Sequence, residues 1–180
     1  MKPCIFFDRD GIVNVAPLTR YVERIDDFHL QTAFFDALAI ANQRGYEAVI
    51  VTNQKGVSTG FTPLAELEKM HAQIQAEAAR RRLRLLDILY CDAPNNEHPR
   101  RKPNPGMLLE AAERHNLDLT ASWMIGDNES DVLTGQRAGC RTIYVGTKSL
   151  TLVPDYTVTD MSEVPGLLQT CLAEGVSRSE

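Results

Sequence analysis

Short apolar runs alternate with longer amphipathic segments along the chain. The apolar runs are rich in β-branched and aromatic residues and have the length of buried strands. They cover Cys4–Phe7, Ala48–Val51, Ile88–Cys91, Trp123–Ile125, Thr142–Val145 and, at an edge, Tyr156–Val158. Because most of these runs are apolar throughout, they predict strands of a mostly parallel sheet that is buried on both faces.

Apolar residues at helical spacing predict a helix between most pairs of strands. We expect helices at Thr32–Arg44, Pro63–Leu83, Gly106–His115, Glu129–Ala138 and Ser162–Ala173. Thr62 is the expected N-cap of the longest helix, which would begin at Pro63. Strands alternating with helices indicate an α/β protein, a Rossmann-like three-layer α/β/α sandwich. In such a sheet, ligands bind beyond the carboxyl ends of the strands.

Length and charge narrow the class of protein. A chain of 180 residues suits one domain spanning 1–180, whose last residues, 174–180, we expect to fray. The net charge of −5 argues against a nucleic-acid or membrane partner, because both favour a basic face. The four cysteines form no C-x-x-C pair, which indicates a reducing compartment. We therefore expect a cytoplasmic protein, and its small size suggests a monomer.

Two carboxylates follow the first predicted strand. Asp8 and Asp10 are separated by one residue, so on an extended segment their side chains point to the same side. Two close carboxylates repel each other, and a divalent cation such as Mg²⁺ would relieve the repulsion and also bind phosphate. Taken alone, the segment is equally well explained as an aspartate-rich turn that ends the strand.

Polar groups suited to phosphate follow the next three strands. The segment Thr52–Gly56 follows the second strand, Arg101 and Lys102 precede a helix after the third, and Asp127 follows the fourth. Each has a plainer explanation when taken alone: a polar turn, a solvated basic pair, or a helix N-terminus with an acidic first turn. The plain explanations together would require four coincidences at one edge of one sheet. That edge is therefore the predicted phosphate site.

These motifs resemble those of the haloacid dehalogenase (HAD) superfamily of phosphohydrolases. D-x-D-G from Asp8, a threonine at position 52, K-P-x-P from Lys102 and G-D-x-x-x-D from Gly126 occur in the superfamily's order over nearly the whole chain. The fuller matches D-R-D-G, T-N-Q and R-K-P-N-P-G-M resemble the branch of D-glycero-D-manno-heptose 1,7-bisphosphate phosphatases and histidinol phosphatases. The resemblance implies a HAD-type fold with little or no cap domain, and the motif spacing leaves no room for a large one.

The resemblance also implies the catalytic and metal-binding residues. Asp8 would be the nucleophile and form an aspartyl-phosphate, and Asp10 would serve as acid and then base. Mg²⁺ would be held by the Asp8 side chain, the Asp10 backbone carbonyl and Asp127. The sequence leaves open whether Asn128 or Asp131 contributes to the metal site.

Further residues would contact the substrate if the resemblance holds. Thr52 and Asn53 would contact the transferring phosphoryl group, and Lys102 would neutralise it and steady the nucleophile. Lys55 and Arg101 are additional candidates for substrate recognition, because they add cations near the expected site.

One feature of the branch is missing. Its members often hold a structural zinc with a C-x-H and a C-x-C pair between the third strand and the lysine. Here Cys91 matches, but Ala93 stands at the first histidine position and no C-x-C precedes Arg101. Structural zinc needs about four ligands, so we expect none. His98 is then interpreted as a solvated loop residue, and the loop Asp92–Arg101 must be ordered in another way.

The function that these observations favour is Mg²⁺-dependent hydrolysis of a small phosphorylated metabolite, a sugar phosphate. D-glycero-D-manno-heptose 1,7-bisphosphate, cleaved at the 7-phosphate, is the first candidate. Histidinol phosphate or another small phosphomonoester stays open, although Lys55 and the basic residues 100–102 favour a second phosphate over a cationic amine. A remote alternative is a non-catalytic phosphate-binding module, which would be expected to lose Asp8, Asp10 or Lys102. A dehalogenase, a mutase and a nucleic-acid end-repair enzyme are disfavoured.

Overall fold

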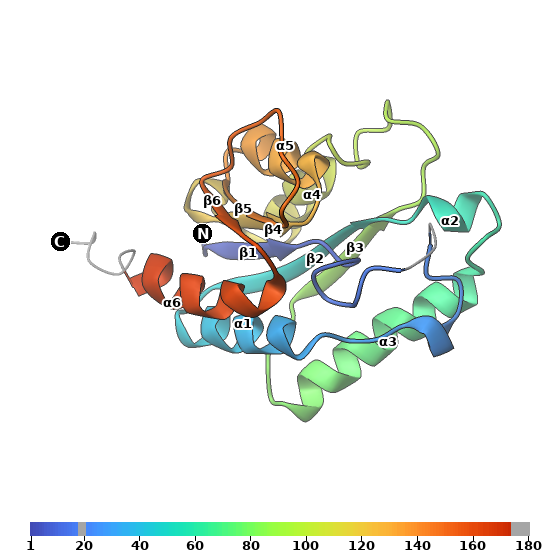
Figure 1. Cartoon of the computed structure of the whole chain (residues 1–180), viewed down its shortest axis with the longest axis horizontal. Helices are drawn as coiled ribbons and strands as arrows, with labels where there is room; N and C mark the ends of the chain where they lie inside the picture. The colour runs from blue at the N-terminus through green and yellow to red at the C-terminus, as the bar shows by residue number, and fades with distance from the viewer. Residues whose placement is uncertain (18–20, 174–180) are drawn as a thin grey trace.

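The structure is a computed structural model that describes residues 1–17 and 21–173. Six parallel strands form one sheet in the order β3-β2-β1-β4-β5-β6 (Figure 1). The strands are β1 (Cys4–Phe7), β2 (Glu47–Asn53), β3 (Asp87–Cys91), β4 (Trp123–Gly126), β5 (Arg141–Val145) and β6 (Tyr156–Val158). The strand order reverses between β1 and β4, which is where open sheets of this type form a crevice at their carboxyl edge.

Helices cover both faces of the sheet (Figure 1). On one face lie α1 (Thr32–Gln43), α3 (Leu64–Arg80) and α6 (Val164–Ala173); on the other lie α4 (Gly106–His115) and α5 (Glu129–Ala138). The alternation of side chains along β1 explains the two layers, because Ile5 and Phe7 join the first core, whereas Cys4 and Phe6 join the second. The predicted three-layer α/β/α fold is thus confirmed.

The predicted elements are present, some of them with shifted ends. β2 runs on to Asn53, so Thr52 lies in the strand. The expected N-cap of α3 was wrong: the cap position is Pro63, and the buried Thr62 hydroxyl donates instead to the Val22 carbonyl at 3.1 Å. The Thr62 side chain therefore makes a tertiary contact in place of the helix cap that the local sequence predicted.

Four short elements had no periodic signal. They are η1 (Ile25–Asp27), α2 (Lys55–Ser58), η2 (Leu119–Ala121) and η3 (Met161–Glu163). The last replaces the first turn of the predicted final helix. The expected fraying falls on 174–180, which lie outside the described residues. Within the described part of the chain, none of the helices combines the length and apolar character that a membrane span requires.

Candidate active site

The carboxyl ends of β1, β2 and β4 converge on a pocket of about 260 Å³. Six of the residues predicted from the sequence line it: Asp8, Asp10, Thr52, Asn53, Lys102 and Asp127. Asn128, Ser130 and Asp131 line it as well, together with Ala16 and Pro17. Lys55 and Arg101 do not line the pocket. The structure therefore brings together the motifs from all four strand ends.

A buried lysine lies among the carboxylates. The Lys102 ammonium pairs with Asp8 Oδ1 at 2.7 Å and with Asp131 Oδ1 at 2.6 Å, and it donates to the Val51 carbonyl at 3.0 Å. Its side chain is only 2% exposed. Burial alone would lower the pKa of Lys102, but Asp131 and Asp8 outweigh it and raise that pKa. The ammonium is therefore a fixed positive charge beside Asp8.

Carboxylates outnumber cations in this cluster. One oxygen from each of Asp8, Asp127 and Asp131 lies within 4.8 Å of the others. Burial, followed by the charge of Asp131, raises the pKa of Asp8 to about 8 and that of Asp127 to about 6. A further cation would relieve this repulsion, and closely spaced carboxylate oxygens are the ligands that Mg²⁺ prefers. The residues present thus fit a magnesium site.

Two glycines make the cluster possible. Gly11 has φ +87°, and a Cβ built there would lie 2.0 Å from Oδ2 of Asp127. A Cβ at Gly126 would lie 2.3 Å from the carboxylate of Asp131. The glycines of D-x-D-G and G-D therefore allow two aspartates to approach the backbone of the loop after β1 and of β4.

Asp131 has two partners of different kinds. Besides pairing with Lys102, it accepts a bond through Oδ2 from the Asn128 backbone at 3.1 Å, which completes a capping box at the start of α5. The Asn128 side chain donates to Asp127 Oδ1 at 2.6 Å. The helix-cap interpretation of this segment is therefore correct, and it coexists with membership in the carboxylate cluster.

The expected acid and base, Asp10, is held by side chains that the sequence analysis did not single out. Arg9, which is fully buried, makes a bidentate ion pair with it, with Nη2 at 2.9 and 3.0 Å from its two oxygens. Asn14 donates to Oδ1 at 3.0 Å and Gln54 to Oδ2 at 3.1 Å. All three lie in or next to the motifs. The signal that the sequence offered for these three residues was their polar character, close after predicted apolar strands.

Asn53 contacts the backbone of Lys102 through both ends of its amide. Its Oδ1 accepts from the Lys102 N–H at 3.0 Å, and its Nδ2 donates to the Lys102 carbonyl at 2.9 Å. This clamp joins the end of β2 to the lysine loop and fixes where the ammonium lies. Asn53 also lines the pocket, so the role expected for it at the phosphoryl group stays a prediction.

Arg101 orders the loop before it. Its guanidinium donates to the Ala93 carbonyl and to Asn96 Oδ1, both at 3.0 Å. Asn104 Nδ2 donates to the carbonyls of Asn96 and His98 at 2.8 and 3.0 Å. Hydrogen bonds of this kind order the loop, in which we expect no structural zinc. His98 is exposed, and its Nδ1 lies 3.7 Å from the sulfur of Cys91.

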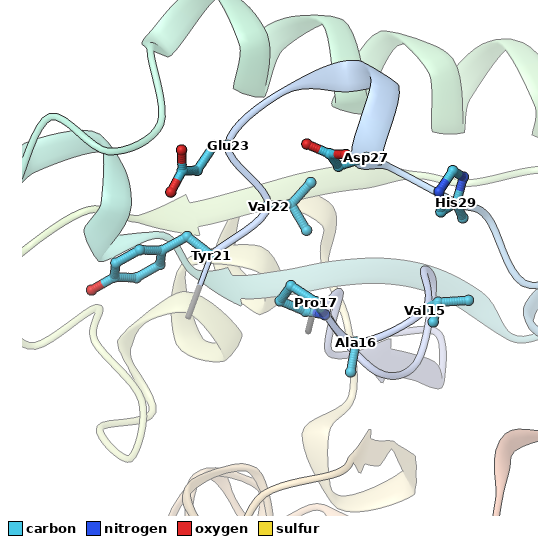
Figure 2. A pocket seen from close by; sticks show the side chains of 8 residues that line it. All are labelled: Val15, Ala16, Pro17, Tyr21, Val22, Glu23, Asp27 and His29. Carbon is cyan, nitrogen blue, oxygen red and sulfur yellow. The ribbon is translucent and has the colours of Figure 1, made fainter. Parts of the chain in front are cut away.

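A second cavity, of about 520 Å³, is lined by the residues drawn as sticks in Figure 2. The two share Ala16 and Pro17 in their linings. Figure 2 shows the carboxylates of Glu23 and Asp27 on the side opposite Pro17. Val15, Tyr21, Val22 and His29 complete the described lining. This cavity mixes apolar surface with acidic groups and shares part of its wall with the pocket that Asp8 lines.

The parallel sheet and the four motifs at its carboxyl edge define a HAD-like hydrolase. A family model for HAD-hydrolase-like proteins matches residues 99–163. The fold is similar to the structure of D,D-heptose 1,7-bisphosphate phosphatase from B. bronchiseptica complexed with magnesium and phosphate, with a TM-score of 0.83 and 27% identity. The match covers 94% of this chain and 99% of that one.

Curated relatives narrow the class to a family. The D-glycero-β-D-manno-heptose-1,7-bisphosphate 7-phosphatase of Helicobacter pylori (strain 26695) is 38% identical over 136 residues, which cover 74% of this chain and 78% of the relative. The enzyme of that name from Photorhabdus laumondii is 32% identical over 180 residues, with 96% and 92% covered. The chain belongs to the family of these heptose bisphosphate phosphatases.

Proposed function

We propose that this protein is a Mg²⁺-dependent phosphoric monoester hydrolase that removes the 7-phosphate of D-glycero-D-manno-heptose 1,7-bisphosphate. The observation that carries the proposal is the ion pair between Asp8 and the buried Lys102, within a cluster of carboxylates at the carboxyl end of β1. The names of the curated relatives support the substrate. Residues 1–180 would form one HAD-like domain without a large cap.

Asp8 would act as the nucleophile. One of its carboxylate oxygens attacks phosphorus, the bond from phosphorus to the sugar oxygen breaks, and an aspartyl-phosphate forms. A carboxylate approaching a phosphate dianion meets like-charge repulsion, which the Lys102 ammonium at 2.7 Å opposes. The Thr52 hydroxyl, which lines the pocket, would donate to an oxygen of the transferring group.

Asp10 would transfer the protons. Its carboxyl group protonates the departing sugar oxygen, and the resulting carboxylate then takes a proton from the water that hydrolyses the aspartyl-phosphate. Proton transfer of this kind contributes roughly 10²–10⁴-fold to the rate. Arg9, Asn14 and Gln54 hold the side chain at the pocket edge, where it is 30% exposed and can meet a substrate.

The metal would be held by the carboxylates of Asp8 and Asp127 and by the backbone carbonyl of Asp10, as the family resemblance implies. Bound there, Mg²⁺ would supply positive charge to the phosphoryl oxygens and to the carboxylate cluster. Asp131 pairs with Lys102, so we assign it to holding the lysine rather than to the metal.

The adjoining cavity would take the sugar body of the substrate. Carboxylates such as Glu23 and Asp27 accept hydrogen bonds from hydroxyl groups, and Pro17 and Tyr21 offer apolar surface to the carbon skeleton. Lys55 is the candidate for the second phosphate. It precedes Gly56, whose backbone lies close to Tyr21 in the cavity wall: a Cβ built at Gly56 would lie 3.2 Å from the Tyr21 ring. Unchanged substrate affinity in Lys55→Ala would remove it from the site.

Phosphate release tests the proposal directly. We would compare both anomers of heptose 1,7-bisphosphate with histidinol phosphate, with Mg²⁺ and with EDTA, beside an Asp8→Asn control. Mg²⁺-dependent turnover that prefers a heptose bisphosphate supports the proposal, and no turnover of any phosphomonoester by the wild-type protein would end it. Preference for histidinol phosphate would favour the second candidate. The ammonium group of that substrate would pair with the acidic Glu23 and Asp27.

Three further properties belong to the proposal. The protein would act in the cytoplasm, in keeping with its free, buried cysteines. It would work as a monomer on a small metabolite, without nucleic acid or membrane. It would carry no structural zinc, and stoichiometric zinc in a metal analysis of the purified protein would contradict this.

A further inference from the structure

Gln54 connects two motifs of the site without lining the catalytic pocket. It follows β2 directly, is 4% exposed, and its backbone N–H donates to the Cys91 carbonyl at 2.7 Å, which fixes it against the end of β3. Its side-chain Nε2 lies 3.1 Å from Asp10 Oδ2 and 2.8 Å from Thr52 Oγ1. The amide therefore joins the expected acid and base to the expected phosphate-binding hydroxyl.

When Asp10 is a carboxylate, it fixes the direction of both hydrogen bonds. Turning the amide over would place Oε1 against the Asp10 carboxylate, so that two acceptors would face each other. With Nε2 in that place, one amide hydrogen reaches Asp10 and the other reaches Thr52. Thr52 Oγ1 is then an acceptor from Gln54, and its own hydrogen is left to donate to another group. A phosphoryl oxygen, which only accepts, is the partner that the pocket would offer.

Gln54 also differs from the other groups that hold Asp10. Arg9 and Asn14 belong to the same loop as Asp10, so they hold its carboxylate from the side of β1. Gln54 directly follows β2 and fixes the Asp10 carboxylate relative to the strand that carries Thr52. Asp10 and Thr52 would act on different oxygens of the reacting phosphate, Asp10 on the leaving oxygen and Thr52 on an oxygen of the transferring group.

We propose that Gln54 is a positioning residue: it aims the Thr52 hydroxyl at the phosphoryl group and holds Asp10 in register with it. This inference rests on the proposed phosphatase function. It assigns Gln54 no contact with substrate, so its loss should lower kcat more than it raises KM. Groups that orient others around a reacting centre typically contribute about 10–100-fold.

Two variants test the proposal by phosphate release from heptose 1,7-bisphosphate. Gln54→Leu keeps the size but removes both donors, and we expect kcat to fall about 10–100-fold. Gln54→Glu keeps the shape but presents an acceptor, so Thr52 would donate to the introduced carboxylate. Inhibition by inorganic phosphate should then weaken about tenfold, the effect of one hydrogen bond to a charged group. Gln136→Leu, which removes an exposed amide bonded to the Val153 carbonyl, is the matched control.

A double-mutant cycle separates positioning from a merely structural role. If Gln54 acts through Thr52, Gln54→Leu should cost clearly less in a Thr52→Val background than in the wild type. The inference is overturned if both Gln54 variants keep the wild-type kcat, if the losses in the cycle are additive, or if a lower folded fraction measured by circular dichroism accounts for the loss. A wild-type protein that releases no phosphate would instead contradict the proposed function itself.

Discussion

The catalytic pocket and the cavity beside it are built differently. In the pocket, Asp8, Asp131 and Lys102 are buried and each is held by partners from another strand end. In the cavity, Glu23 and Asp27 are exposed and come from the long connection between β1 and α1. Chemistry that needs fixed charges is thus placed on the rigid sheet edge. The proposed substrate recognition would lie where a substitution costs the fold little.

The largest effect should come from Asp8, the proposed nucleophile. Asp8→Asn removes the attacking oxygen charge but keeps the shape, so phosphate release should fall about 10⁵-fold or more. Circular dichroism should show an intact fold. Near-normal turnover by the pure variant would mean that the pocket is not where the chemistry occurs.

Replacing the buried lysine should lower the free energy of unfolding. Lys102→Met leaves the carboxylates of Asp8 and Asp131 buried without their cation, and breaking such a pair typically costs about 3–5 kcal/mol. The free energy of unfolding in urea, measured in EDTA, checks this. Lys148→Met, at an exposed position, is the control and should stay within about 0.5 kcal/mol of the wild type. Equal stability of the two variants would show that the cluster is not held by Lys102.

The cavity should respond in affinity and not in stability. Glu23→Gln together with Asp27→Asn removes two acceptors for sugar hydroxyls. We expect KM for heptose 1,7-bisphosphate to rise about tenfold relative to KM for p-nitrophenyl phosphate, which has no sugar. Asp26→Asn alters a neighbouring exposed acid that does not line the cavity and serves as the control. An unchanged KM ratio would remove these carboxylates from the sugar site.

The stability of the metal-free protein should also depend on pH. Burial and Asp131 raise the pKa of Asp8 to about 8. In the folded, metal-free protein the Asp8 carboxyl group therefore keeps its proton at pH values at which the unfolded chain has lost it. The stabilising contribution is fully present below about pH 4 and is lost as pH rises toward 8. Urea unfolding in EDTA should show a steeper loss of stability between pH 5 and 8 for the wild type than for Asp8→Asn. Mg²⁺ at pH 8 should restore wild-type stability. Parallel curves would contradict the raised pKa.

Much of the site could be predicted because its motifs follow buried strands. Asp8, Thr52 and Asp127 were expected at one sheet edge, since the carboxyl ends of parallel strands meet there. Partners were harder to predict. Thr62 satisfied the local rule for an N-cap, yet its hydroxyl donates to Val22. Arg101 was expected at the substrate, yet its guanidinium holds the loop at Ala93 and Asn96.

The sequence alone determined the α/β class, the order of the motifs and the family, because periodicity and motif spacing are local properties of the chain. Tertiary structure decided which polar groups meet. Asp131 became the second partner of Lys102, Arg9 and Gln54 became the holders of Asp10, and an acidic cavity formed beside the pocket. The physical reason is that a hydrogen bond or ion pair between distant segments depends on distance and direction within a few tenths of an ångström. The folded backbone sets both.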